Sequence, residues 1–249
     1  MRAYPLGNHS KPQTGTVGLS RPPLGLSIPL FNEEADVVEV VNELRATLKA
    51  AKIPSALVLV NNGSSDSTGK LINQLAAKDE SLLAIHLEEN GGYGGGILAG
   101  MRQLQTPILG WVWGDGQVRP DVVVDTYEAL INTGACLAKA KRTLREDGRQ
   151  RWFVSKAYNL VLRGMGSKLS DANGCPKLFT RDTWERLSPS STDWFLDPEV
   201  VLRALELGLI WTEVDAVMHA RSGGASKVHR ETVVEFIEHL RAWRGGWRP

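Results

Sequence analysis

The sequence is poor in cysteine, in net charge and in long apolar runs, and each scarcity argues against a class of protein. Its two cysteines, Cys136 and Cys175, form no zinc or disulfide framework and are compatible with a reducing cytosol. The net charge of +1 gives no electrostatic reason to expect a nucleic-acid partner. No apolar run approaches the ~20 residues that span a bilayer, and residues 1–23 lack the apolar stretch of a signal peptide. We therefore expect a cytoplasmic globular protein.

Strand and helix patterns alternate through the first half of the chain and become less regular in the second half. This alternation predicts an α/β fold with a mostly parallel sheet flanked by helices. The expected strands are 24–29, 56–60, 82–87, 108–113, 135–140 and 209–214. The expected helices are 33–51, a helix capped by Ser65 or Asp66 and ending near Ala77, 92–104, 120–133, 152–165, 198–207 and 231–243, and a charged loop is expected at 142–151.

The apolar run 108–113 ends at a carboxylate and an amide two residues apart, Asp115 and Gln117. The carboxyl end of a buried parallel strand lies at the sheet edge where open α/β proteins bind ligands. Carboxylate and amide oxygens suit a hard divalent cation and the phosphates that it carries. An ordinary polar turn is the alternative interpretation of these two residues alone.

Three other loops follow predicted strands. Phe31 can line a base pocket, and Asn32 or Glu33 can either accept hydrogen bonds from a nucleoside or favour the start of the next helix. Asn62 has both a donor and an acceptor for a base edge, although a plain turn explains this loop equally well. The glycines of 91–96 allow either close backbone approach to a ligand or close packing of a helix on the sheet.

Six short motifs stand in a fixed order along the chain: SIPLFNEE (27–34), VNNGSSDST (60–68), ENGGYGGG (89–96), DGQ (115–117), DANGCPKLF (171–179) and RSGGASK (221–227). In this combination the chain resembles the family 2 glycosyltransferases of the GT-A fold. The resemblance runs from about Leu26 to Lys227. It is strongest to the polyprenyl-phosphate branch, which includes enzymes like dolichol-phosphate-mannose synthase.

This resemblance implies a site for a nucleotide-diphosphate-sugar at the carboxyl edge of the sheet. It implies Mg²⁺ or Mn²⁺ held by Asp115 and Gln117, where the cation neutralises charge on the departing diphosphate. Catalytic roles fall to Asp115, Asp197 and Glu199. The implied donor-binding residues are Pro29, Phe31, Glu33, Asn62, Ser64, Gly92, Trp113, Gly114 and a basic clamp of Arg221, Ser226 and Lys227; the implied acceptor-side residues are Arg142, Asp171 and Lys177.

The chain departs from the family pattern at three carboxylates. Asn61 and Asn62 stand where the family usually has two aspartates, and Trp113 replaces the first aspartate of an Asp-x-Asp motif. Fewer carboxylates predict a weaker metal site, because ligand charge tunes affinity. The departures leave open an altered nucleotide preference. They also leave open a catalytically weak or inactive relative that serves as a nucleotide-binding or partner subunit.

The acceptor-side residues allow two interpretations each. Asp197 and Glu199 either supply a base for an attacking hydroxyl or simply favour a helix start, and an ionised phosphate acceptor needs no base. Lys177 either meets an acceptor phosphate or pairs with Asp171. Arg142 and the arginines of the charged loop either face a lipid phosphate or are solvated.

Taken together, the sequence predicts an inverting transferase that uses a UDP- or GDP-sugar and either a polyprenyl phosphate or a soluble hydroxyl acceptor. Residues 1–23 are expected to form a flexible tail, and 24–228 a single glycosyltransferase domain with a donor half (24–133) and an acceptor half (134–228). A C-terminal helix and tail occupy 229–249. Trp243 and Trp247 with nearby arginines suit peripheral contact with the inner face of a membrane, and a homo-oligomer is a further expectation.

Overall fold

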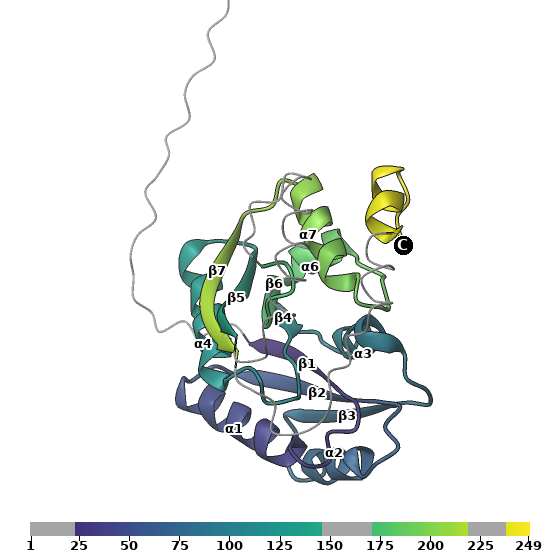
Figure 1. Ribbon diagram of the computed structural model, residues 1–249. Helices are drawn as coiled ribbons and strands as arrows, with labels where there is room; N and C mark the ends of the chain where they lie inside the picture. Colours follow the sequence, from purple (N-terminus) through teal and green to yellow (C-terminus); the bar gives the residue numbers. More distant parts are fainter. Residues whose placement is uncertain (1–22, 146–170, 219–237) are drawn as a thin grey trace, which may run out of the picture.

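The structure of the protein, a computed structural model, describes residues 23–145, 171–218 and 238–249. Within these residues a central sheet of seven strands runs in the order β3-β2-β1-β4-β6-β5-β7, and helices pack against it (Figure 1). The strands are β1 (Leu24–Leu30), β2 (Ser55–Asn62), β3 (Leu82–Leu87), β4 (Ile108–Trp111), β5 (Leu137–Arg145), β6 (Lys177–Thr180) and β7 (Trp211–Met218).

Apart from α6, the described helices are close to the sequence-based expectation, and most begin or end within a turn of it. The largest difference is at residues 33–36, which precede the first helix instead of opening it. The helices are α1 (Val37–Ala50), α2 (Thr68–Ala76), α3 (Gly92–Met101), α4 (Pro120–Thr133), α6 (Arg181–Leu187) and α7 (Leu196–Glu206), and residues 238–244 form a last helical segment.

The expected mostly parallel sheet is confirmed, with one antiparallel insertion. β1 pairs in parallel with β2 and β4, β2 with β3, and β5 with β7. β6 lies between β4 and β5 and is antiparallel to both. Neither β6 nor α6 was expected, because four residues that begin with a lysine are too short and too polar to show a strand pattern.

α3 packs unusually close to the sheet, and its glycines make this approach feasible. A Cβ atom on Gly100 would overlap the side chain of Ser27, and one on Gly96 would press against Asn62. The Ser27 hydroxyl donates to the carbonyl oxygen of Ile97 at 3.0 Å, which fixes the contact further. Within the glycine run, close packing on the sheet is therefore confirmed for Gly96, whereas Gly94 lies against the backbone of Ser191.

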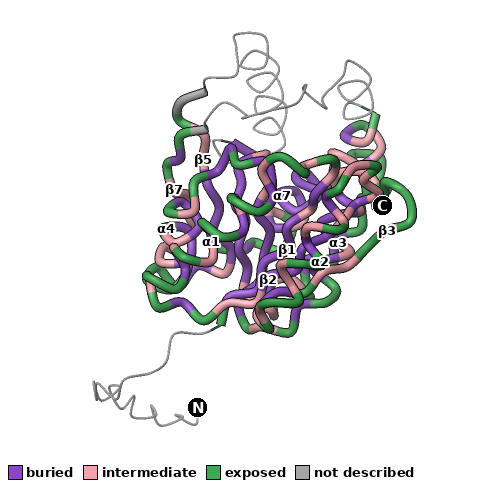
Figure 2. Tube along the Cα trace, turned by 90° about the horizontal axis from the view of Figure 1, so that it is seen from below, coloured by how far each residue is buried: buried purple, intermediate pink, exposed green. Residues whose placement is uncertain are grey.

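α1 and α4 cover the face of the sheet opposite to α3. Successive strand residues point to opposite faces, so Ile28 points away from the α3 face that Ser27 contacts. Ile28 lines a small cavity of about 50 Å³ together with Leu44 of α1 and Val123 of α4. The strands between these two helical layers are buried along most of their length (Figure 2).

β5 is longer than expected, and this corrects the placement of Arg142. The sequence suggested a strand ending at Ala140 and a charged loop from Arg142. Instead β5 pairs with β7 as far as Arg145, with one register irregularity between Arg142 and Leu144. The rest of the expected charged loop and the expected helix 152–165 lie outside the described residues.

A second, smaller core joins α7 to the C-terminal helical segment. Trp243 is only 4% exposed, its indole N–H donates to Glu206 at 3.0 Å, and Arg248 stacks over its ring while pairing with Glu206. The proposed membrane patch is therefore wrong for Trp243, which packs against Phe195 instead. In the described part of the chain, no helix combines the length and the apolar character needed to cross a bilayer.

Candidate active site

The parallel strands bring several loops to one edge of the sheet. The segments after β1, β2 and β4 meet there, because these three strands point the same way. β6 runs in the opposite direction, so its first residue, Lys177, reaches the same edge and pairs with Trp111 of β4. Residues from both halves of the chain thus face one place.

The loops after β1 and β2 are joined by hydrogen bonds between backbone and side chain. The N–H of Asn32 donates to the Ser64 hydroxyl at 3.0 Å, and the Asn32 side chain accepts from the N–H of Ser65 at 2.9 Å. The N–H of Glu33 donates to the hydroxyl of Thr68 at 2.9 Å. These contacts hold Pro29 to Glu33 against the second loop, and a nucleoside contact by these residues stays a prediction.

The Asn62 amide ties β2 to the start of α3. Its nitrogen donates to the carbonyl oxygen of Gly92 at 3.0 Å and to the Asn90 side chain at 3.3 Å. Its oxygen accepts from the N–H of Gly91 at 3.0 Å, and the residue is 5% exposed. Both protons of the Asn62 amide nitrogen are thus in use, whereas its oxygen can still accept a second hydrogen bond, for instance from a base N–H.

The loop after β4 presents the two candidate metal ligands. Asp115 and Gln117 are each 7% exposed, and the N–H of Gln117 donates to the Asp115 carboxylate at 3.2 Å. Gly116 lies between them at a φ of +69°, a conformation that favours glycine. Gly114 packs so tightly on Leu30 that a Cβ atom would overlap that side chain.

The oxygen ligands of this loop fit a divalent cation only as part of a larger site. Asp115 supplies one carboxylate and Gln117 one amide oxygen, which are ligand types that Mg²⁺ accepts. The described residues contain no group of three acidic, histidine or cysteine side chains able to hold a metal. A cation here would take its remaining ligands from water and from a bound diphosphate.

Trp113 takes part in a chain of hydrogen bonds. Its indole N–H donates to the Tyr93 hydroxyl at 3.0 Å, and this hydroxyl donates to the Asp197 carboxylate at 2.9 Å. Burial raises the pKa of Tyr93 well above its usual value, and the charge of Asp197 raises it further. The hydroxyl therefore stays protonated.

Lys177 and Asp197 form a buried ion pair. The Lys177 ammonium donates to the Asp197 carboxylate at 2.5 Å and to the carbonyl oxygen of Gly174 at 2.9 Å. Both side chains are at most 3% exposed. The suggested pairing of Lys177 with Asp171 is wrong, because Asp197 occupies that role.

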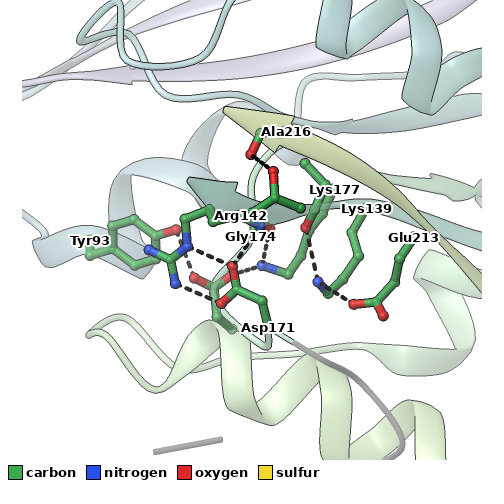
Figure 3. A network of polar contacts seen from close by, with 11 residues as sticks. Tyr93, Lys139, Arg142, Asp171, Gly174, Lys177, Glu213 and Ala216 are labelled. Atoms are coloured by element: carbon green, nitrogen blue, oxygen red, sulfur yellow. Dashed lines mark hydrogen bonds and ion pairs between the residues drawn. The ribbon is translucent and has the colours of Figure 1, made fainter. Parts of the chain in front are cut away.

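Asp171 pairs instead with Arg142 through two parallel hydrogen bonds of 2.6 Å, as Figure 3 shows. The N–H of Arg142 donates to the same carboxylate at 3.2 Å. Burial alone would raise the pKa of Asp171, but the hydrogen bonds and charge of Arg142 outweigh it and hold this pKa well below its usual value. Arg142 is thus neutralised inside the protein.

Replacing Asp171 by asparagine is expected to lower the free energy of unfolding by about 2–3 kcal/mol at neutral pH, because a charged hydrogen-bonded pair is lost. Since the folded state lowers the pKa of Asp171, the pair stabilises fully above the usual aspartate pKa of 3.8 and less as the pH falls below it. The gap between wild type and variant should therefore shrink in acid.

Urea unfolding at a series of pH values measures this gap. Asp215→Asn is the matched control, because Asp215 pairs with Lys141 at the surface with 68% of its side chain exposed. A gap for Asp171→Asn that stays constant from neutral pH into acid would contradict the assignment. The control should leave the acid dependence unchanged.

Glu199 is fully buried and bonded on both oxygens. The backbone N–H groups of Ser190 and Ser191 donate to its carboxylate at 3.1 and 2.8 Å. Arg203, one turn later on α7, donates at 2.8 Å. These contacts fix the segment before α7 to the helix itself.

Two polar residues of this region were missed by sequence reasoning. Tyr93 lies inside the glycine run, whose glycines are the stronger signal in the sequence. Lys139 is buried in the otherwise apolar β5, and its ammonium pairs with Glu213 at 3.0 Å (Figure 3). Burial lowers the pKa of Lys139, although the charges of Asp171 and Glu213 oppose this. A lysine within an apolar strand was the available signal.

The implied basic clamp of Arg221, Ser226 and Lys227 lies outside the described residues. The other implied residues gather at the carboxyl edge from both halves of the chain. The seven-stranded sheet with one antiparallel strand and an acidic loop after β4 agrees with the expected GT-A fold. The chain belongs to glycosyl transferase family 2, whose family model matches residues 26–187.

The chain is similar to curated enzymes that act on lipid phosphates. It is 29% identical over 154 residues to an undecaprenyl-phosphate 4-deoxy-4-formamido-L-arabinose transferase from Pseudomonas fluorescens, covering 61% of this chain and 45% of that enzyme. It is 23% identical over 244 residues to the dolichyl-phosphate beta-glucosyltransferase ALG5A of Trichomonas vaginalis, covering 89% of this chain and 75% of that enzyme. The chain therefore spans about half the length of the bacterial relative.

Solved structures confirm the fold. Glucosyl-3-phosphoglycerate synthase from Mycobacterium tuberculosis, in complex with Mn²⁺, uridine diphosphate and phosphoglyceric acid, superposes with a TM-score of 0.71 at 17% identity. The match covers 92% of this chain and 80% of that one. The same enzyme with Mg²⁺ and uridine diphosphate gives a TM-score of 0.70.

Proposed function

We propose that the protein transfers a sugar from a nucleotide-diphosphate-sugar to a polyprenyl phosphate, with inversion at the anomeric carbon. The observation that carries this choice of acceptor is the state of Asp197 and Glu199. A hydroxyl acceptor requires a base within hydrogen-bonding reach. Both carboxylates are buried and bonded on both oxygens, so neither is free to accept a proton from such an acceptor.

A phosphate acceptor fits this arrangement because it arrives ionised. Its oxygen can attack the anomeric carbon without losing a proton to the protein, while the bond from that carbon to the diphosphate breaks. In this proposal Asp197 and Glu199 hold the start of α7 in place and do not take part in proton transfer. The names of the relatives, which specify undecaprenyl phosphate and dolichyl phosphate, support the same acceptor class.

Asp115 and Gln117 would hold a divalent cation beside the donor diphosphate. When bound, the cation would neutralise negative charge that develops on the departing nucleoside diphosphate. The related structures that contain Mn²⁺ or Mg²⁺ with uridine diphosphate support this role and make a uridine nucleotide the first donor to test. Because this site has one carboxylate, we expect the metal to bind tightly only when the nucleotide is present.

The donor half, 24–133, would bind the nucleotide, and the acceptor half, 134–228, would meet the lipid phosphate. In the described part of the acceptor half, Arg142 and Lys177 are neutralised by Asp171 and Asp197. Arg149 and Arg151, which lie outside the described residues, would then be candidates for meeting the acceptor phosphate. A peripheral location at the inner face of a membrane follows from a lipid acceptor.

Transfer to undecaprenyl phosphate in phospholipid vesicles, compared with undecaprenol in the same vesicles, tests this proposal. Radiolabelled UDP-sugars and GDP-sugars would be supplied with Mn²⁺, and labelled lipid would be measured. We expect transfer to the phosphate to exceed transfer to the alcohol by at least about 100-fold, because neither Asp197 nor Glu199 is free to act as base.

Equal transfer to undecaprenol, or transfer to 3-phosphoglycerate alone, would overturn the lipid-phosphate assignment. Nucleotide binding without transfer to any acceptor would instead favour the alternative of a catalytically inactive relative. Calorimetric titration with UDP, GDP, CDP and dTDP, with Mn²⁺ or with EDTA, separates that case from a protein that binds no nucleotide.

A further inference from the structure

The hydrogen-bond chain from Trp113 to Lys177 joins four elements that are distant in sequence. Trp113 follows β4 and stands two residues before Asp115. Tyr93 belongs to α3, Asp197 to the first turn of α7, and Lys177 to the first residue of β6. These hydrogen bonds thus connect the loop of Asp115 and Gln117 to the acceptor side of the site.

The chemistry of each group fixes the direction of this chain. An indole N–H only donates, an ionised carboxylate only accepts, and a phenol hydroxyl has one proton and can also accept. Tyr93 must therefore accept from Trp113 and donate to Asp197, as the two distances of 3.0 and 2.9 Å indicate. Its ring is fixed in addition by stacking on Trp194, with centroids 4.4 Å apart and planes 10° apart.

Trp113 therefore does more than occupy the place of a missing carboxylate. Where the family usually has a carboxylate, Trp113 has an indole N–H, which is connected to Asp197 through the Tyr93 hydroxyl. The only proton that Tyr93 can donate goes to the carboxylate that also neutralises Lys177. Loss of the Tyr93 hydroxyl would remove the hydrogen bonds to Trp113 and to Asp197 at once.

We propose that Tyr93 is a positioning residue for sugar transfer, which holds the loop of Asp115 and the start of α7 in one fixed geometry. This inference rests on the proposed function. The hydroxyl itself touches neither reactant in the proposal and acts through Trp113 and Asp197. Displacements of about 1 Å between reacting groups lower catalysis by about 100-fold, so a residue that fixes their spacing affects turnover more than donor binding.

Tyr93→Phe tests the proposal because it removes the hydroxyl and keeps the ring on Trp194. We expect kcat for transfer to fall by about 10- to 100-fold. The dissociation constant of UDP with Mn²⁺ should change less than about twofold, because the variant leaves the proposed metal ligands and nucleotide-binding residues unchanged. Trp113→Phe removes the donor from the other end, and its effect should not add to that of Tyr93→Phe in the double variant.

Tyr127→Phe is the matched control, because Tyr127 is a buried tyrosine of α4 on the other face of the sheet. It should leave kcat unchanged even where it lowers thermal stability. Additive effects of the two single variants on kcat would overturn the proposal. An equal loss of kcat in Tyr127→Phe would do so as well, since it would indicate a general loss of stability.

The indole N–H signal of Trp113 in ¹⁵N-labelled protein separates this inference from the proposed function. It is assigned by its absence in Trp113→Phe. Its position should move in Tyr93→Phe, because its acceptor has gone, whether or not the protein transfers any sugar. An unmoved signal would contradict the hydrogen bond between Trp113 and Tyr93. A moved signal in a protein without transferase activity would support that hydrogen bond and contradict only the proposed role of Tyr93 in sugar transfer.

Discussion

Replacing Asp197 by asparagine is expected to lower the free energy of unfolding by about 3–5 kcal/mol, which is the usual cost of removing one partner of a buried ion pair. Lys177 has no exposed side-chain surface, so water cannot solvate the ammonium once its partner is neutral. The Tyr93 hydroxyl would also lose its charged acceptor. Urea unfolding at neutral pH measures the loss.

A double variant distinguishes an unpaired charge from a loss of packing. Lys177→Met with Asp197→Leu replaces the ion pair by apolar side chains, a change that is often neutral for stability. We expect this protein to be more stable than Asp197→Asn alone, although it should be inactive if α7 shifts. A double variant as unstable as the single one would show that packing, and not the buried charge, is the cause. A cost below about 1 kcal/mol for Asp197→Asn would mean that water reaches the pair.

Replacing Asp115 by alanine is expected to lower metal-dependent transfer by at least about 100-fold, comparable to the loss of a group that stabilises charge in the transition state. The described residues contain no group of three acidic, histidine or cysteine side chains that could hold the metal in its place. Initial rates across a range of Mn²⁺ concentrations measure the effect. The fold should persist, because Asp115 lies in the loop after β4, outside the strands and helices of the described structure.

Asp121→Ala is the matched control for this variant. Asp121 lies in the first turn of α4, six residues after Asp115, and 56% of its side chain is exposed. Its replacement should change neither the rate nor its dependence on Mn²⁺. If Asp115→Ala retained wild-type rates with the same metal dependence, the cation would have to bind elsewhere and the assignment of Asp115 would fail.

Local sequence patterns predicted the strand ends that carry this site. The apolar runs before Pro29, Asn62 and Asp115 are each buried strands, and each ends at the sheet edge as expected. Such patterns depend on neighbouring residues alone, so the strand ends could be predicted from the sequence. The same reasoning failed at β6, where Lys177 begins a strand that is buried only because other elements surround it.

The assignment of partners could not be made in the same way. Lys177 pairs with Asp197, although Asp171 is nearer to it in the sequence. Asp171 pairs instead with Arg142, which lies 29 residues earlier. Sequence shows only that acidic and basic residues are present in about equal number. The folded backbone decides which charges meet.

By itself the sequence determined an α/β chain of glycosyl transferase family 2 with an acidic loop after a central strand. Those properties follow from periodicity and short motifs, which are local. Only the tertiary structure decided that Asp197 and Glu199 are fully bonded and that Tyr93 connects Trp113 to Asp197. The contact between Tyr93 and Asp197, 104 residues apart, depends on how α3 and α7 are brought together by the fold. The burial that removes water from a charged group is likewise a property of the whole fold.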